Sequence, residues 1–186
     1  SHTNLTDFIR LSQLADGTIL GVGNRREPDL ETQSWNPDTY GCREAEWFTI
    51  RSEDKGETWS LPQPFDPPIT GQAYEHCHAA VPLSDGRILL PTALIRNWSG
   101  DAPHGLKTIA LISHNQGRTW PEYVELFSDP DGQINHHEVS VIEMPDGSLL
   151  SVAWPFNPSV GKTELKVPFA IAPDGSEFTL PGRSLL

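Results

Sequence analysis

Charged or imidazole side chains stand at three points along the chain where an inner strand is expected to begin. These points are Phe8-Ile9-Arg10, Glu75-His76-Cys77-His78 and His136-His137-Glu138. Residues 24–31 add a fourth group, Asn-Arg-Arg-Glu-Pro-Asp-Leu-Glu. Arginines beside carboxylates suit bidentate binding of an anionic group, and carboxylates can move protons or support a nucleophile. The residue types therefore predict a site that holds an acidic group and carries out acid–base or nucleophilic chemistry.

The composition excludes several classes of partner. The 186 residues carry a formal net charge of -12, which argues against binding to nucleic acid or to anionic membrane surfaces. No apolar run approaches the roughly 20 residues needed to cross a bilayer. The chain opens without the basic and apolar segments of a signal peptide, so any secretion signal is expected to have been removed or to lie outside this sequence. Cys42 and Cys77 are expected to be free thiols, because nothing in their spacing requires a pair.

Two interleaved repeats define the organisation of the chain. The pattern S-x-[D/N]-x-G-x-T-W occurs at residues 52–59 and again at residues 113–120, each time after a short apolar run. Asp-Gly turns flanked by apolar runs occur at Asp16, Asp85 and Asp146, at intervals of 69 and 61 residues. Both motifs are typical of tight turns between strands, so they indicate a repeating unit of nearly constant length.

Each unit is expected to contain four strands. In the second unit we expect them at residues 79–83, 87–95, 108–113 and 120–127. Four-stranded sheets repeated at this period predict an all-β fold, a β-propeller, and no segment has the periodicity of a helix. The expected blade units of the single partial domain, 1–186, are residues 8–66, 75–128 and 137–186. Three blades cannot close a ring, so the chain is expected to be part of a longer protein, or to pair with another copy.

Alternating strand directions sort the connections into two ends of the molecule. Both kinds of turn fall at one end, where they serve the fold. The other end receives the entries to the innermost strands and the long loops at residues 24–46, 96–107 and 155–166. Loops around the axis of a propeller usually bind ligands. The candidate chemical residues are therefore expected to meet at the loop end.

The sequence resembles the sialidase superfamily, whose Asp-box repeats match the two S-x-[D/N]-x-G-x-T-W copies. Arg10-Leu11-Ser12-Gln13-Leu14 stands where that family has Arg-Ile-Pro-Ala-Leu, and Gly21-Val22-Gly23-Asn24-Arg25 is similar to its Phe-Ala-Glu-x-Arg. His137-Glu138-Val139-Ser140-Val141-Ile142-Glu143 is similar to its Asn-Glu-x-x-Val-x-Glu. The resemblance covers all three units and implies a propeller of six blades.

The resemblance also implies a mechanism with retention of configuration. Arg10 would bind the carboxylate of a sialic acid, and Asp29, with Glu31 as the second choice, would be the general acid/base. Glu138 would activate a nucleophilic tyrosine, which would lie beyond Leu186 together with a third arginine. A second arginine would be expected within residues 153–166, where the basic residues are both lysines, Lys162 and Lys166.

The sequence thus predicts an exo-acting, sialidase-like glycoside hydrolase, secreted or periplasmic, that removes terminal sugars from glycans without a cofactor. Besides the catalytic Asp29 and Glu138, the predicted substrate-binding residues are Arg10, Arg25, Arg26, Glu75, His76, His78 and His137. The missing second arginine leaves open an exo-glycosidase of the same fold for a different sugar. A carbohydrate-binding propeller without catalysis is a further alternative.

Some of these residues have other interpretations. Arg25 could form a surface ion pair, and Arg10 could pair with an acidic neighbour on its strand. The four histidines at residues 76, 78, 136 and 137 could place imidazoles at the axis for zinc or another transition metal, which is the less favoured interpretation. Trp35 or Trp98 could stack on a sugar.

Overall fold

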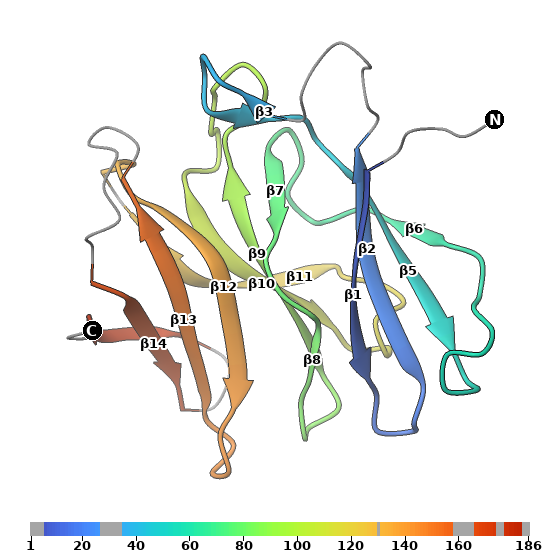
Figure 1. Cartoon of the computed structure of the whole chain (residues 1–186). Helices are drawn as coiled ribbons and strands as arrows, with labels where there is room; N and C mark the ends of the chain where they lie inside the picture. The colour runs from blue at the N-terminus through green and yellow to red at the C-terminus, as the bar shows by residue number, and fades with distance from the viewer. Residues whose placement is uncertain (1–5, 27–34, 130, 158–165, 174–176, 184–186) are drawn as a thin grey trace, which may run out of the picture.

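The computed structural model describes residues 6–26, 35–129, 131–157, 166–173 and 177–183. These residues form antiparallel strands and turns, without helices (Figure 1). Within this part of the chain no helix could span a membrane.

The first sheet contains β1 (Thr6–Gln13), β2 (Ile19–Arg26), β5 (Glu46–Ser52) and β6 (Gln63–Phe65). The second contains β7 (Ala73–His76), β8 (Val81–Pro82), β9 (Ile88–Ile95), β10 (Lys107–Ser113) and β11 (Glu122–Ser128). The third contains β12 (Asn135–Glu143), β13 (Leu149–Phe156), β14 (Pro168–Ala172) and β15 (Thr179–Arg183).

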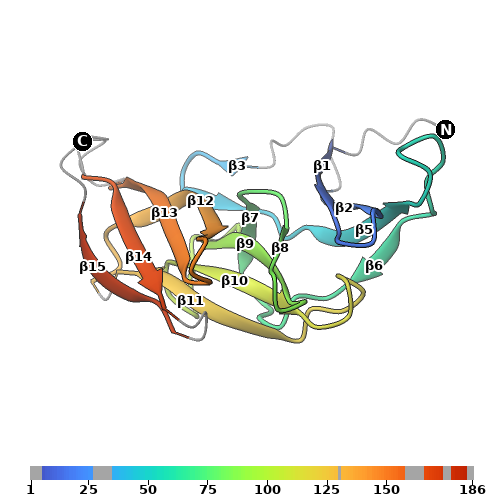
Figure 2. The same cartoon turned by 90° about the horizontal axis from the view of Figure 1, so that it is seen from below.

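The three sheets stand side by side as successive blades. Each has its strands in chain order, and Figure 2 shows β6, β11 and β15 along the outside of the resulting arc. A small hairpin of β3 (Trp35–Asn36) and β4 (Gly41–Cys42) lies beside the ends of the blades (Figure 1). The prediction of an all-β propeller with four-stranded blades is therefore confirmed.

The inner strands differ from the prediction in two places. In the second sheet the inner strand is not a single strand at 79–83 but two short ones, β7 and β8, interrupted at residues 77–80. In the third sheet β12 runs past a register shift between His137 and Ser140. Both irregularities insert extra residues on the inner strand, which bends it and changes the direction of its side chains. The alternation of apolar and polar residues in the sequence does not show where a strand contains an extra residue.

Apolar side chains between neighbouring sheets hold the blades together. One buried cluster, which includes Leu20, Trp47 and Leu90, joins the first sheet to the second. Another, which includes Leu89, Val141 and Ala170, joins the second to the third. Burial of apolar area stabilises each seam by roughly 25 cal/mol per Å². Each seam therefore fixes how the ends of two blades face one another.

Turn chemistry explains why the strands reverse where they do. In the first copy of the eight-residue motif, Asp54 Oδ1 accepts hydrogen bonds from Ser52 Oγ and Thr58 N, both at 2.8 Å. In the second copy Asn115 Oδ1 accepts the bond from Thr119 N at 2.9 Å. The glycine of each motif has a positive φ, 94° at Gly56. The motif therefore closes its turn by its own side chains, which is a structural role.

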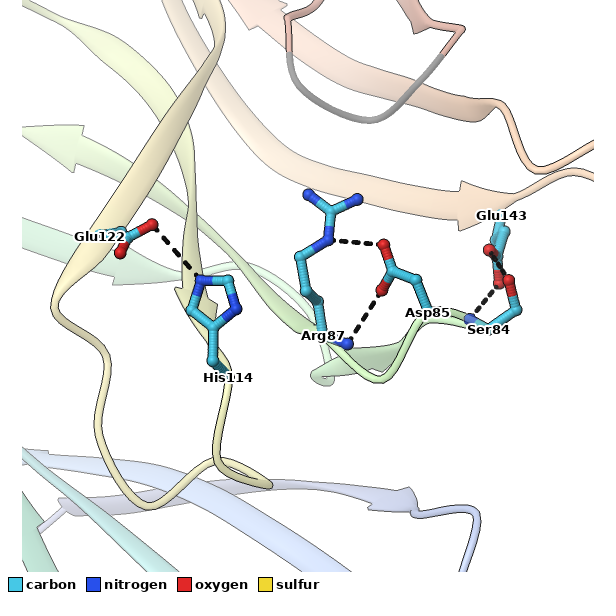
Figure 3. A network of polar contacts seen from close by, with 6 residues as sticks. All are labelled: Ser84, Asp85, Arg87, His114, Glu122 and Glu143. Carbon is cyan, nitrogen blue, oxygen red and sulfur yellow. Dashed lines mark hydrogen bonds and ion pairs between the residues drawn. The ribbon is translucent and has the colours of Figure 1, made fainter.

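The turn end also links the second and third sheets (Figure 3). Glu143 Oε2 accepts a hydrogen bond from the backbone N–H of Ser84 at 2.9 Å, and Glu143 Oε1 accepts one from its hydroxyl at 2.6 Å. Within the turn Asp85 accepts from Arg87 Nε at 2.7 Å. The carboxylates of Glu143 and Asp85 therefore stabilise turns and contacts between strands at this end.

Replacing Asp54 with asparagine should make the protein less sensitive to acid. Hydrogen bonds from Thr58, with a smaller one from Ser52, lower the pKa of Asp54 from 3.8 to about 2. A carboxyl whose pKa is lower in the folded state stabilises the fold above its unfolded pKa, and this contribution is lost as the pH falls toward the folded value. The asparagine cannot titrate, and Asn115 shows that an amide closes the same turn.

The test is the melting temperature of both proteins between about pH 5 and about pH 2. We expect a smaller fall for Asp54→Asn than for the unmodified protein. An equal fall would show that this turn does not contribute to the acid sensitivity.

Candidate active site

A cavity of about 480 Å³ opens at the loop end, where the three sheets and the β3–β4 hairpin meet. It lies at the end opposite the Asp-Gly turns, as the strand directions predicted. Its lining combines charged, imidazole and aromatic side chains: Arg10, Asn24, Arg26, Trp35, Tyr40, Cys42, Glu75, His76, Ile95, Asn135, His137, Glu138, Trp154 and Phe156. Six of the nine predicted site residues are among them. Asp29, with the second choice Glu31, lies outside the described residues, as does Lys162.

Glu138 occupies a strained backbone position in the cavity wall. It lies in the register shift of β12 and has a φ of 49°, in the left-handed region that side chains other than glycine rarely adopt. Its carboxylate is exposed and makes no hydrogen bond or ion pair with another described residue. Such strain costs of order 1–3 kcal/mol and is concentrated at functional sites. The backbone thus directs an available carboxylate into the cavity.

Glu75 is a second carboxylate in the wall, and two donors orient it. His137 Nδ1 donates to Glu75 Oε2 at 2.7 Å, and Cys77 Sγ lies 3.6 Å from the same oxygen. The two cysteines are both free, as predicted. Burial raises the pKa of the Cys77 thiol well above its ordinary value, so the thiol keeps its proton and can donate it. Glu75 is therefore held in one orientation.

The three arginines have different surroundings. Arg10 lines the cavity, next to His76. Arg26 also lines it, but its guanidinium donates to backbone carbonyls, from Nε to Arg43 O at 2.9 Å and from Nη2 to Tyr74 O at 2.7 Å. Arg25 does not line the cavity, because neighbouring residues of a strand point to opposite faces.

The Arg25 guanidinium instead lies 4.8 Å from the centre of the Phe48 ring and 3.9 Å from a carboxylate oxygen of Glu46. Arg25 thus makes the kind of surface ion pair that was its alternative interpretation. Of these three arginines, Arg10 and Arg26 line the cavity and Arg25 does not.

The histidines are dispersed among different roles. His76 is 6% exposed and packs against Trp47 at 5.2 Å, and burial lowers its pKa to about 4 with a smaller contribution from Arg10, so it is neutral near pH 7. His78 is exposed and does not line the cavity. His136 stacks on Phe127 with ring centres 5.5 Å apart. No group of metal-binding side chains occurs among the described residues.

The β3–β4 hairpin forms one wall of the cavity with Trp35 and Tyr40, whose rings meet edge to face at 5.3 Å. The side chains of Asn36 and Thr39 donate to the carbonyl of Trp98, at 3.1 and 2.9 Å. Trp98 itself lies under Arg43 at 4.3 Å and does not line the cavity. Of the two tryptophans proposed for sugar stacking, the structure brings Trp35 to the site.

The backbone of the hairpin passes close to the backbone of Asn97 at Gly41, which has no side chain. Gly41→Ala should therefore displace the hairpin. A Cβ at residue 41 would lie 1.8 Å from the backbone carbonyl oxygen of Asn97, which a backbone cannot relieve without moving. We expect at least a tenfold higher KM for the substrate, or about 1.4 kcal/mol of lost binding, with a smaller loss of stability. Gly86→Ala is the control for stability, since a Cβ there meets no atom within 4 Å and its cost comes only from the positive φ of 91°, which Gly41 does not share. An unchanged KM in Gly41→Ala would contradict the role of the hairpin as a wall.

Trp154 and Phe156 were not identified from the sequence. Both end β13, their ring centres are 5.9 Å apart, and Trp154 is 44% exposed at the cavity. The alternation of β13 and its end at the loop face were the available signals, but the ligand-facing side depends on the register with β12. Carboxylates beside exposed aromatic rings can carry out proton transfer on a flat, hydroxyl-rich ligand.

Comparison with known proteins places the fold. No protein-family model and no curated protein sequence matches the chain. A protein of unknown function from Dyadobacter fermentans superposes with a TM-score of 0.65 at 24% identity, over 92% of this chain and 48% of that one. The Hadza microbial sialidase Hz136 superposes with 0.67 at 16% identity, over 95% and 37%. An α-L-arabinanase of Penicillium chrysogenum, in complex with arabinobiose, superposes with 0.61 at 16% identity, over 97% and 50%. The chain thus spans half or less of each of these proteins and shares their β-propeller fold.

Proposed function

We propose that this chain forms part of a glycoside hydrolase that removes a terminal sugar from a glycan. The observation that carries the proposal is the cavity at the loop end, which combines the carboxylates of Glu75 and Glu138 with exposed aromatic rings such as Trp154. Aromatic faces bind the apolar faces of sugar rings, and glycoside cleavage needs carboxyl groups at the scissile bond. The names of the similar structures, a sialidase and an arabinanase, support the same class of reaction.

The first candidate substrate is a sialic acid or a related acidic sugar. Arg10 supports it, because a guanidinium in the cavity wall can bind a sugar carboxylate in bidentate fashion. In this version Asp29 protonates the leaving oxygen. Glu138 accepts the proton of a tyrosine as the tyrosine attacks the anomeric carbon, and water then releases the sugar with retained configuration.

The second candidate is a neutral sugar. Arg26 donates to two backbone carbonyls and Arg25 lies away from the cavity, so neither brings an uncommitted guanidinium to a wall that carries two carboxylates. A neutral ring avoids repulsion from Glu75 and Glu138. In this version Glu138 and Asp29 are the carboxyl pair of an ordinary glycosidase.

Hydrolysis of a panel of fluorogenic glycosides by the full-length protein tests the proposal. Release from an α-sialoside selects the acidic sugar, and release from an α-L-arabinofuranoside or another neutral glycoside selects the second candidate. Whichever glycoside is hydrolysed, the Glu138→Gln variant must fail to release its sugar. Glycan binding without release of sugar from any member would overturn the hydrolase and favour a carbohydrate-binding propeller.

A further inference from the structure

A glutamate of the second sheet and a histidine of the third meet inside the cavity. Glu75 comes from β7 and His137 from β12, and their side chains are 26% and 19% exposed. The contact joins Nδ1 to Oε2 at 2.7 Å. A second such pair, His114 and Glu122, lies at the turn end at 3.4 Å with both side chains more than half exposed (Figure 3). The cavity pair is therefore shorter and better shielded than its counterpart on the surface.

The contact defines which nitrogen of His137 carries the proton. A carboxylate oxygen can only accept, so the Nδ1–H of His137 donates to Glu75. The Cys77 thiol lies 3.6 Å from the same oxygen of Glu75. The His137 imidazole, at 2.7 Å, is therefore the closer of the two donors to this oxygen. A neutral imidazole with a proton on Nδ1 has a lone pair on Nε2. Nε2 is then a hydrogen-bond acceptor.

Two aromatic rings lie near the imidazole ring of His137. The His137 ring lies 5.9 Å from Trp154 and 6.5 Å from Phe156, centre to centre, and makes no second hydrogen bond with a described residue. A sugar that lies against an aromatic ring presents its hydroxyl groups at the edge of the stack. Hydroxyl groups donate to a lone pair, whereas carbonyl and carboxylate oxygens cannot.

We propose that Glu75 and His137 act as one unit that selects a hydroxyl group of the bound sugar. His137 Nε2 accepts the hydrogen bond of a hydroxyl on the ring that lies against Trp154, and Glu75 is the positioning residue that fixes the tautomer. The unit rests on the proposed function, because it takes a sugar as its ligand. It makes the site reject a sugar that lacks this hydroxyl, because the bound ring would cover the acceptor and leave it without a donor.

Nitrogen NMR of histidine-labelled full-length protein tests the tautomer without any substrate. We expect a protonated Nδ1 and an unprotonated Nε2 for the neutral form of His137, and a mixture of tautomers after Glu75→Gln. Glu122→Gln, which removes the partner of His114 at the other end, should leave the His137 signals unchanged. A neutral His137 with its proton on Nε2 in the unmodified protein would overturn the proposal.

Addition of N-acetylneuraminic acid and of L-arabinose to the same sample tests the ligand. One of the two should shift the Nε2 signal of His137 and not that of His114; if neither does, the proposal fails. His137→Asn keeps an amide donor for Glu75 but removes the Nε2 acceptor, and should weaken binding of that sugar about tenfold. If the His137→Asn variant binds the sugar as tightly as the unmodified protein, the contact of Glu75 with His137 is structural only and the proposal is wrong.

These outcomes separate the unit from the hydrolase. A shifted Nε2 signal without turnover of any glycoside would contradict the proposed hydrolysis and keep the hydroxyl-binding unit. Turnover that His137→Asn leaves unaffected would keep the hydrolase and overturn the unit.

Discussion

Replacing Glu138 with glutamine is expected to abolish turnover and leave the fold intact. The amide has the same shape as the carboxylate, and Glu138 makes no hydrogen bond or ion pair with a described residue that the change could break. The variant loses the group that accepts a proton at the reacting centre, which typically costs about 10²- to 10⁴-fold in rate. The measurement is kcat on the glycoside that the full-length protein hydrolyses fastest, together with the melting temperature.

Two further variants give this result its meaning. Glu122→Gln, an exposed glutamate at the turn end, should retain full activity. Glu138→Gly should be inactive and yet more stable, by up to about 1 kcal/mol, because glycine adopts the left-handed conformation without strain. If Glu138→Gln keeps half of the activity, the strained glutamate does not serve catalysis.

Truncation of Trp120 should have the largest effect on stability. This tryptophan of the second turn motif is 2% exposed and packs in the cluster between the first and second sheets, with the Phe65 ring at 5.9 Å. Removing a buried aromatic side chain costs about 3–5 kcal/mol in free energy of unfolding. We expect a loss of this size for Trp120→Ala in denaturant unfolding.

Tyr123→Ala is the matched control, because it removes an aromatic ring that is 44% exposed on β11 of the same sheet. It should change the free energy of unfolding by less than about 1 kcal/mol. Equal losses in the two variants would contradict the structural role of the turn motif. So would a Trp120→Ala protein that unfolds normally but no longer hydrolyses substrate.

The fold was predictable because its signals are local. The glycines of the turns at Gly56 and Gly117 have positive φ, and their spacing gives the period of the blades. Strand directions then follow from alternation alone, and they separate the turn end from the loop end. The interruption of the inner strand at residues 77–80 was missed, because an inserted residue leaves no mark in an apolar pattern.

The candidate site was predictable in its location but less so in its members. Glu75, His137 and Glu138 reach the cavity, as expected from their places at inner-strand entries. Arg25 and Arg26 are neighbours in sequence, and the register of β2 decides which one faces the cavity. The contact of Glu75 with His137 spans 62 positions and depends on the bend of β12, which only the packed blades determine.

The most direct test of the account is a crystal structure of the full-length Glu138→Gln protein soaked with the glycoside that the unmodified protein hydrolyses. We predict an intact substrate in the cavity, with its terminal ring against Trp154 and its scissile bond beside residue 138. An empty cavity with the glycoside bound elsewhere on the protein would contradict the account.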